Sequence, residues 1–196
     1  MAVVTGSEPL FIANHAALDF INTAFGMGPD AREVLPDDRG VVAWLHAAGL
    51  LEDPVPDPPA GLATLARELR DAAGRLVRMP ASPVPADMAL VNRIREQGRP
   101  LSVLEWNASE RRPGLVERRR DDGIFSLLEP VATLVARLVS EGDLRRVRKC
   151  EAHDCTLLFE DATRSGRRRW CSMALCGNRM KVAAFRARRH DRDGGQ

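Results

Sequence analysis

Apolar residues recur at every third or fourth position in four segments of the chain. This spacing gives a helix one apolar face, which is buried against other elements. Two proline-rich clusters, EDPVPDPP at 52–59 and PASPVPA at 80–86, interrupt regular structure between segments. The pattern therefore predicts amphipathic helices over residues 41–48, 62–77, 88–95 and 129–141.

Residues that start or stop helices lie at the expected ends of these segments. Asp37 or Asp38 stands near the start of the first helix, and Gly49 stands near its end. Asp87 opens the third helix. Pro130 falls at the start of the fourth, where a proline is tolerated because an N–H in the first turn has no partner within the helix.

Between the third and fourth helices the pattern changes to alternation. Residues 101–106 are apolar at alternate positions, and Gly114-Leu-Val-Glu117 precedes a charged run that ends at Asp122-Gly123. Alternation between glycine-containing turns is typical of antiparallel strands. We therefore expect a small antiparallel β-meander over residues 101–128, in an N-terminal domain, residues 1–143, that is α+β and mostly helical.

Charge is unevenly distributed, although the formal net charge of the chain is only +2. Residues 1–143 carry 15 basic and 21 acidic side chains, a net charge of −6. Residues 144–196 carry 14 basic and 6 acidic side chains, a net charge of +8. A basic module attached to an acidic body favours contact of that module with a polyanion. The alternative is a solvated arginine-rich tail.

The sequence predicts a cytoplasmic protein that does not enter a membrane. The apolar runs fall far short of the ~20 residues that a membrane-spanning helix needs. The first residues, MAVVTGSEPL, lack the basic and long apolar regions of a signal peptide. The excess of arginine over lysine is typical of a bacterium with a GC-rich genome.

All four cysteines form two pairs of equal spacing, Cys150-x₄-Cys155 and Cys171-x₄-Cys176, with fifteen residues between the pairs. Two such knuckles can place four thiolates around one tetrahedral Zn²⁺, at Zn–S distances of ~2.3 Å. Disulfides are rare in the cytosol, and free core cysteines would not cluster as two equal pairs. We expect one structural Zn²⁺, because four thiolates leave no position for a water. His153 could replace one cysteine, but we expect it on the surface.

The residues around the cysteines predict a small zinc-finger fold. They indicate a strand, a turn and a returning strand over residues 156–160, 161–166 and 167–170. A helix follows Cys176, so that the start of this helix supplies the last ligand. This order is treble-clef-like. We expect the finger over residues 144–190 and a disordered tail over 191–196.

The segment RKCEAHDCTLLFEDATRSGRRRWCSMALCGNRMK closely resembles the CGNR zinc finger, whose motif stands here as Cys176-Gly177-Asn178-Arg179. Leu18-Asp19-Phe20-Ile21-Asn22-Thr23, followed later by Trp44-Leu45, is similar to the ABATE domain, the usual partner of that finger. The resemblance implies a stress-induced transcription regulator, with the four cysteines as zinc ligands and the finger as the DNA-binding part.

Independently of this resemblance, cationic side chains surround the cysteines. Guanidinium groups form forked hydrogen bonds with phosphate and with guanine, so an arginine-dominated set favours DNA as the partner. Arg179 could instead bond to backbone around the zinc knuckle, and we expect Trp170 to pack on the core of the finger. The predicted nucleic-acid contacts are Arg167, Arg168, Arg169, Arg179, Lys181 and Arg186.

The N-terminal domain offers one candidate ligand site. Asp19, Asn22 and Thr23 lie on a predicted first helix beside apolar residues, and their polar groups could line a pocket for a small-molecule effector. The alternative is that they satisfy buried backbone groups or cap a neighbouring element. The body would sense a ligand in the first case, and homodimerisation is a further role for it.

These observations favour a zinc-dependent, DNA-binding transcription regulator and not an enzyme. No acid–base pair, Ser-His-Asp set or phosphate-cradling glycine loop stands out in the sequence. Two alternatives stay open. In the first, zinc only stabilises a protein–protein interaction module that does not touch DNA. In the second, the N-terminal body is an enzyme and the finger holds an RNA substrate.

Overall fold

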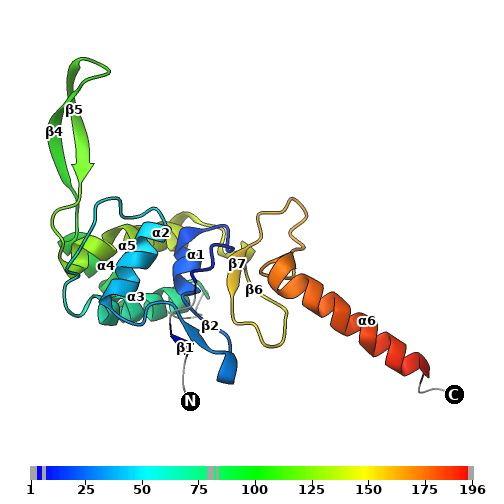
Figure 1. Cartoon of the computed structure of the whole chain (residues 1–196). Helices are drawn as coiled ribbons and strands as arrows, with labels where there is room; N and C mark the ends of the chain where they lie inside the picture. The colour runs from blue at the N-terminus through cyan, green and yellow to red at the C-terminus, as the bar shows by residue number, and fades with distance from the viewer. Residues whose placement is uncertain (1–3, 6–7, 79–81, 83, 194–196) are drawn as a thin grey trace.

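A computed structural model describes residues 4–5, 8–78, 82 and 84–193 of the chain. It consists of a helical body and a cysteine-containing module, from which a long helix extends (Figure 1). The helices are α1 (Ala16–Ile21), α2 (Asp38–Ala47), α3 (Leu62–Leu76), α4 (Pro85–Gln97), α5 (Ile124–Glu141) and α6 (Asn178–Asp193). The strands are β1 (Val4–Thr5), β2 (Ala24–Phe25), β3 (Arg32–Glu33), β4 (Leu101–Asn107), β5 (Arg112–Arg118), β6 (Val147–Lys149) and β7 (Leu158–Glu160).

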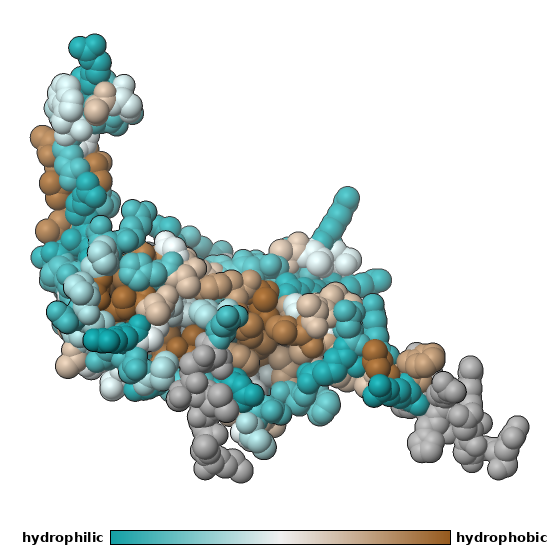
Figure 2. All heavy atoms as spheres, viewed as in Figure 1, coloured by the Kyte–Doolittle hydropathy of each residue, from teal (hydrophilic) through white to brown (hydrophobic). Residues whose placement is uncertain are grey.

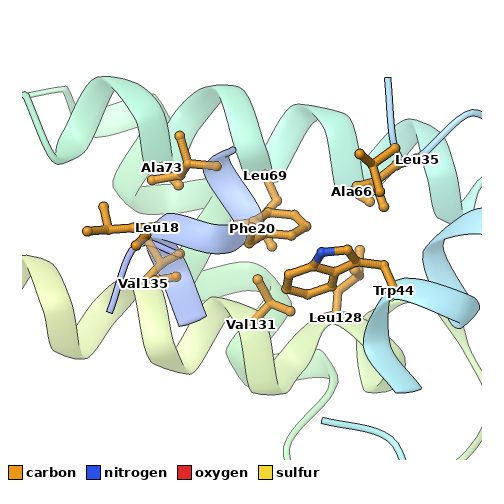
Figure 3. Close-up of a cluster of buried hydrophobic side chains, with 14 of the residues drawn as sticks. Leu18, Phe20, Leu35, Trp44, Ala66, Leu69, Ala73, Leu128, Val131 and Val135 are labelled. Atoms are coloured by element: carbon orange, nitrogen blue, oxygen red, sulfur yellow. The ribbon is translucent and has the colours of Figure 1, made fainter. Parts of the chain in front are cut away.

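The core of the body lies where α1, α2, α3 and α5 meet (Figure 3). Phe20 of α1 packs edge-on against Trp44 of α2, with ring centroids 5.3 Å apart, and both side chains are buried. Leu69 of α3 and Val131 of α5 complete this contact from the other helices. Burying each such side chain contributes about 1.5–3 kcal/mol, so the four helices stabilise one another.

The four helices predicted from apolar spacing are present as α2, α3, α4 and α5. The carboxylate of Asp37 caps α2 by accepting from the Gly40 N–H at 2.8 Å. The neighbouring carboxylate of Asp38 accepts from the Ala63 N–H at 2.7 Å and so caps the start of α3. The two aspartates therefore hold the starts of two helices that are adjacent in the core.

The predicted meander over 101–128 is wrong in its last part, because α5 already begins at Ile124. The carboxylate of Asp121 accepts from the Gly123 N–H at 2.8 Å and turns the chain into the helix. Pro130 consequently lies inside α5 and not in its first turn. Burial of the apolar face of α5, including Val131 and Val135, offsets the hydrogen bond that Pro130 cannot donate.

Strands β4 and β5 form an antiparallel hairpin, in register from Leu101 opposite Arg118 to Asn107 opposite Arg112. The hairpin extends from the body at the end opposite α6 (Figure 1). Leu104 and Leu115 face each other across it and are 67% and 73% exposed. Figure 2 shows apolar side chains along this arm.

Two further small sheets complete the fold. In the first, β3 lies between β1, to which it is parallel, and β2, to which it is antiparallel. In the second, β6 pairs with β7 in antiparallel register. The whole is α+β and mostly helical, as predicted. No helix among the described residues is long and apolar enough to cross a membrane.

The hydrophobic core continues from the body into the cysteine-containing module. Phe159 of β7 is fully buried in the same cluster as Leu18 of α1, and the Glu160 N–H donates to the Ala13 carbonyl at 2.8 Å. The domain boundary near residue 143 therefore stays a prediction, and the apolar core crosses it. At the other end α6 runs to Asp193, into the segment predicted to be a disordered tail; residues 194–196 lie outside the described part.

Candidate metal centre and nucleic-acid interface

The first cysteine pair lies in the loop that joins β6 to β7. Lys149 pairs with Leu158 at the ends of the two strands. The Cys150 N–H donates to the Leu157 carbonyl at 2.9 Å, and the Cys155 N–H donates to the Ala152 carbonyl at 3.0 Å. These bonds fold the intervening residues into a knuckle with both thiols on its inner side.

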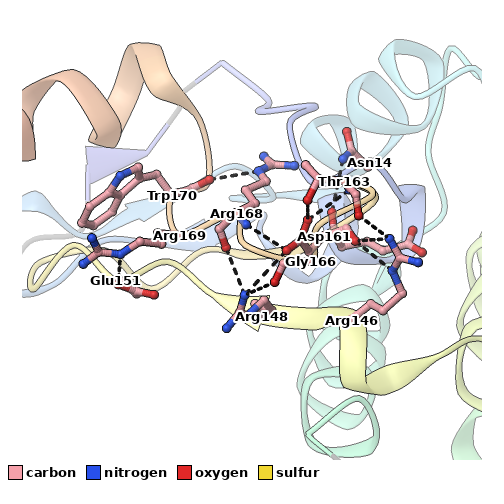
Figure 4. Close-up of polar contacts among 11 residues, drawn as sticks. Asn14, Arg146, Arg148, Glu151, Asp161, Thr163, Gly166, Arg168, Arg169 and Trp170 are labelled. Carbon is pink, nitrogen blue, oxygen red and sulfur yellow. Dashed lines mark hydrogen bonds and ion pairs between the residues drawn. The ribbon is translucent and has the colours of Figure 1, made fainter.

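The predicted hairpin of 156–160 with 167–170 is wrong, because β7 pairs with β6 and residues 167–170 form no strand. The physical reason is the buried carboxylate of Asp161 (Figure 4). It accepts from the Arg168 N–H at 2.9 Å and from the Thr163 N–H at 3.1 Å, which folds 161–168 into a closed loop. The hydroxyl of Thr163 is also the largest cause of the lowered pKa of Asp161.

The second cysteine pair surrounds the start of α6. The Ser172 hydroxyl accepts from the Leu175 N–H at 2.9 Å and caps a π-helical turn, η3 (Met173–Gly177), that runs directly into α6. A Cβ atom on Gly177 would lie 2.5 Å from Met173 Sδ and 3.2 Å from Trp170 Cδ1. Glycine therefore lets Met173 and Trp170 pack closely behind Cys176, and Trp170 packs on the core of the finger as predicted.

The four cysteines fit one structural Zn²⁺. All four are buried, and their sulfur atoms all lie within 4.8 Å of one another. Cys155 Sγ and Cys171 Sγ are 3.9 Å apart, close to the ~3.8 Å edge of a tetrahedron with Zn–S bonds of ~2.3 Å. His153 is outside this set, because its side chain is 82% exposed. The shell is closed by sulfur, which is the arrangement of a structural zinc.

Crowding and burial shift the pKa values of three of the four thiols. A hydrogen bond from Cys171 lowers the pKa of Cys155. The same hydrogen bond, then burial and the negative charge of Cys155, raise the pKa of Cys171. Burial is also the main cause of the raised pKa of Cys176. Four thiolates this close together need a compensating charge, which a dication supplies.

One hydrogen bond to sulfur and one ion pair connect the two knuckles. The Cys171 N–H donates to Cys150 Sγ at 3.3 Å. The Arg179 guanidinium lies 3.6 Å from Cys176 Sγ and also forms a forked pair with Asp154 of the first knuckle, at 2.5 and 2.7 Å. Partners of this kind hold metal ligands in position. Arg179 of the Cys-Gly-Asn-Arg motif is thus engaged across the zinc set, but through the side chains of Asp154 and Cys176 and not through the backbone groups that the alternative interpretation names.

Arg168 links the finger to the body. Its guanidinium lies over the ring of Phe159 at 4.3 Å. It donates to the Trp170 carbonyl and to the Ile12 carbonyl, each at 3.0 Å, and to the Cys171 carbonyl. These contacts within the protein engage the guanidinium of Arg168, so it is not free to bind a phosphate.

The other predicted DNA contacts differ in their surroundings. Arg169 is exposed but pairs with Glu151 at 2.6 Å and lies over the ring of Trp170 at 4.9 Å (Figure 4). Arg167, Lys181 and Arg186 are exposed and form no ion pair or hydrogen bond within the described part of the chain. The set therefore divides into cations held by the fold and cations that face solvent.

Three residues of the site were not identified from the sequence, two that organise it and one exposed cation. Asp154 holds Arg179, and Asp161 organises the loop before the second knuckle. Arg164 is exposed in that loop and forms no ion pair among the described residues. The only signal for Asp154 was its place beside Cys155 in an otherwise basic module.

Asp19, Asn22 and Thr23 are buried and hydrogen-bonded. Asp19 accepts from the Ile12 and Ala13 N–H groups at 2.9 Å, and burial raises the pKa of Asp19. Asn22 bonds to the backbone of β7. Thr23 donates to the Phe20 carbonyl at 2.7 Å. These are the bonds that the alternative interpretation requires, and an effector site at these residues stays a prediction.

The fold and the site define a class of protein, a helical body joined to a zinc finger with four cysteine ligands. Residues 14–142 match the ABATE family, described as "Putative stress-induced transcription regulator", and residues 146–189 match the CGNR zinc finger. The chain therefore belongs to the ABATE family and carries a CGNR zinc finger after its ABATE domain. No protein in the curated comparison matches the chain.

Proposed function

We propose that this protein is a zinc-dependent transcription regulator whose finger binds DNA. The observation that carries the proposal is the set of exposed cations without partners in the described structure, Arg167, Lys181 and Arg186, on a module with a net charge of +8. Free guanidinium and ammonium groups are available to phosphates, whereas those of Arg168 and Arg179 are not.

Helix α6 is the element that fits the major groove. It extends away from the rest of the molecule (Figure 1), and its diameter of about 10–12 Å matches a groove about 12 Å wide. At 100° per residue, five residues within the stretch 178–186 share one arc of about 140°. These are Asn178, Lys181, Val182, Phe185 and Arg186.

The chemistry of this arc suits recognition of a duplex. Lys181 and Arg186 lie at its two edges, where the strands of the groove present their phosphates. Asn178 can form a forked pair with adenine, and the exposed Phe185 can contact a thymine methyl group. Arg167 would add a phosphate contact from the loop before the second knuckle.

The test is binding to a DNA duplex of the protein's own upstream region, followed by fluorescence anisotropy. We expect the variant Arg167→Ala/Lys181→Ala/Arg186→Ala to bind much more weakly than the parent, because three phosphate contacts are lost. Arg39→Ala, an exposed arginine of the body, is the matched control. Equal affinity of the parent and the triple variant, at equal zinc content, would refute the proposal.

A second candidate is a protein–protein interaction module. Four apolar side chains of the finger, Met173, Leu175, Val182 and Phe185, are between 44% and 59% exposed, and exposed apolar groups are typical of docking surfaces. Salt separates the two candidates, since only phosphate contacts weaken steeply with ionic strength.

The proposal also includes a location for the protein and a role for its N-terminal body. The protein acts in the cytoplasm on chromosomal DNA and catalyses no reaction. The families of its two parts are described as a regulator and a zinc finger, which supports this view. The body would sense an effector or join two copies of the chain.

A further inference from the structure

A cavity of about 520 Å³ lies at the junction of the body and the zinc finger. Its walls are the end of α3, the 3₁₀ turn η2 (Leu144–Arg146) and the strands β6 and β7 that flank the first knuckle. This volume is within the range of about 300–1,000 Å³ in which proteins bind small molecules. Neither the sulfur set nor the proposed DNA face uses it.

The lining combines apolar walls with cations. Val77, Leu144, Val147 and Leu158 supply apolar surface from four different elements of the chain. The charged residues of the lining are Arg78, Arg145 and Lys149, and none of the described lining residues is acidic. A cationic lining is notable beside a body whose net charge is −6.

Two of these cations are available to a ligand. Lys149 is exposed and has no ion-pair partner in the described structure. Arg78 donates to the Gly74 carbonyl at 2.6 Å through Nη1, and its other N–H groups have no hydrogen-bond partner among the described residues. Arg145 pairs with Asp143, but its side chain is 83% exposed, and such surface pairs are weak.

We propose that this cavity binds a small amphipathic organic anion, such as an aliphatic or aromatic carboxylate. The apolar part would contact Val77, Val147 and Leu158, and the anionic group would accept hydrogen bonds from Lys149 and Arg78. Charge-assisted bonds of this kind are stronger than neutral ones. This pocket is distinct from Asp19, Asn22 and Thr23.

The position of the cavity couples such a ligand to the zinc. Lys149 directly precedes Cys150, and Thr156, which also lines the cavity, directly follows Cys155. A bound anion therefore touches α3 of the body and both ends of the first knuckle. It stabilises the zinc-loaded finger against the body, whether the partner of the finger is DNA or another protein.

The test uses zinc-loaded full-length protein and 8-anilinonaphthalene-1-sulfonate, an apolar aromatic probe with one anionic group. We expect saturable binding of one probe per chain, detected by fluorescence. The variant Lys149→Gln/Arg78→Gln should weaken it at least tenfold, because both hydrogen-bonding cations are lost. The matched control Lys181→Gln removes an exposed cation outside the cavity and should bind like the parent.

A second variant tests the cavity without a substitution directly beside the zinc ligand Cys150. Leu144→Glu places an anionic group in the cavity from η2 and should also abolish binding, with zinc content unchanged. Leu104→Ser/Leu115→Ser removes the apolar face of the hairpin arm and should leave binding intact. As a second measurement, the bound probe should slow transfer of zinc to a chelator in the parent and in the two control variants, but not in the two cavity variants.

Three results would overturn the assignment. They are the absence of saturable binding, an unchanged affinity in both cavity variants, and loss of binding in the hairpin variant. Because no DNA is present in these experiments, their failure is separate from failure of the proposed function.

Discussion

The side-chain amide of Asn22 is hydrogen-bonded to both backbone groups of Leu158. It donates to the Leu158 carbonyl at 2.8 Å and accepts from the Leu158 N–H at 2.9 Å, in a buried position. Asn22 thereby forms hydrogen bonds with the edge of β7 that faces away from β6. A residue at the end of the first helix of the body thus holds the strand that follows the first zinc knuckle.

Asn22→Ala should destabilise the protein by about 2–6 kcal/mol, because two buried backbone groups of Leu158 lose their partner at about 1–3 kcal/mol each. Chemical unfolding of the zinc-loaded protein measures this. Asn92→Ala, on the exposed face of α4, is the control and should change stability by less than about 0.5 kcal/mol. Equal effects of the two substitutions would show that the Asn22 bonds do not hold the finger to the body.

The metal should be one zinc per chain with sulfur ligands only. X-ray absorption is expected to show four sulfur neighbours, since the four buried thiols enclose the site. Cys176→Ser should release the metal and unfold the finger, because folding and metal binding are one event in small zinc modules. A nitrogen neighbour in the spectrum would instead assign a ligand role to His153.

Arg179→Ala should weaken zinc binding about tenfold, in line with the loss of residues that support metal ligands. The reason is its position between Asp154 and Cys176 Sγ. A competition with a chelator measures the effect. Asp154→Asn should have a similar effect, and the double variant should lose little more. Additive losses would mean that Arg179 and Asp154 act separately.

Arg167 and Arg168 are neighbours in the sequence, but we expect their alanine variants to affect different properties, DNA binding in one case and stability in the other. Arg168→Ala should cost about 2–3 kcal/mol of stability, because a partly buried guanidinium loses three carbonyl acceptors and the ring of Phe159. Arg167→Ala should leave stability unchanged and weaken DNA binding. Unfolding curves and DNA titrations of the two variants provide the comparison, and a reversed order would contradict the division of these cations.

The helices and the zinc ligands could be predicted from the sequence because their signals are local. The apolar spacing of α3 and the two equal cysteine spacings each lie within a short segment. The strand pairing of the finger could not be predicted, since β6 has only three residues and they resemble part of a cationic cluster. The sequence predicts a strand over residues 124–128, where α5 begins, because a short apolar run fits a strand and a helix equally well.

The roles of the individual arginines depend on contacts that are distant in the sequence. Arg168 bonds to Ile12, 156 positions away, and Arg179 bonds to Asp154. Nothing in the run Arg167-Arg168-Arg169 distinguishes the guanidinium that turns inward. For the same reason the cavity beside Lys149, whose walls come from α3 and the finger, had no signature in the sequence.

The most direct test of the central claim is the salt dependence of DNA binding by the zinc-loaded protein. Affinity for its own upstream duplex is measured between 50 and 200 mM salt, beside a scrambled duplex, for the parent and for Arg167→Ala/Lys181→Ala/Arg186→Ala. Each phosphate contact contributes about 0.9 to the slope of log affinity against log salt. We predict a steep parent slope that decreases in magnitude by about 2–3 in the triple variant. No binding to either duplex at low salt, or equal slopes for the two proteins, would contradict the account.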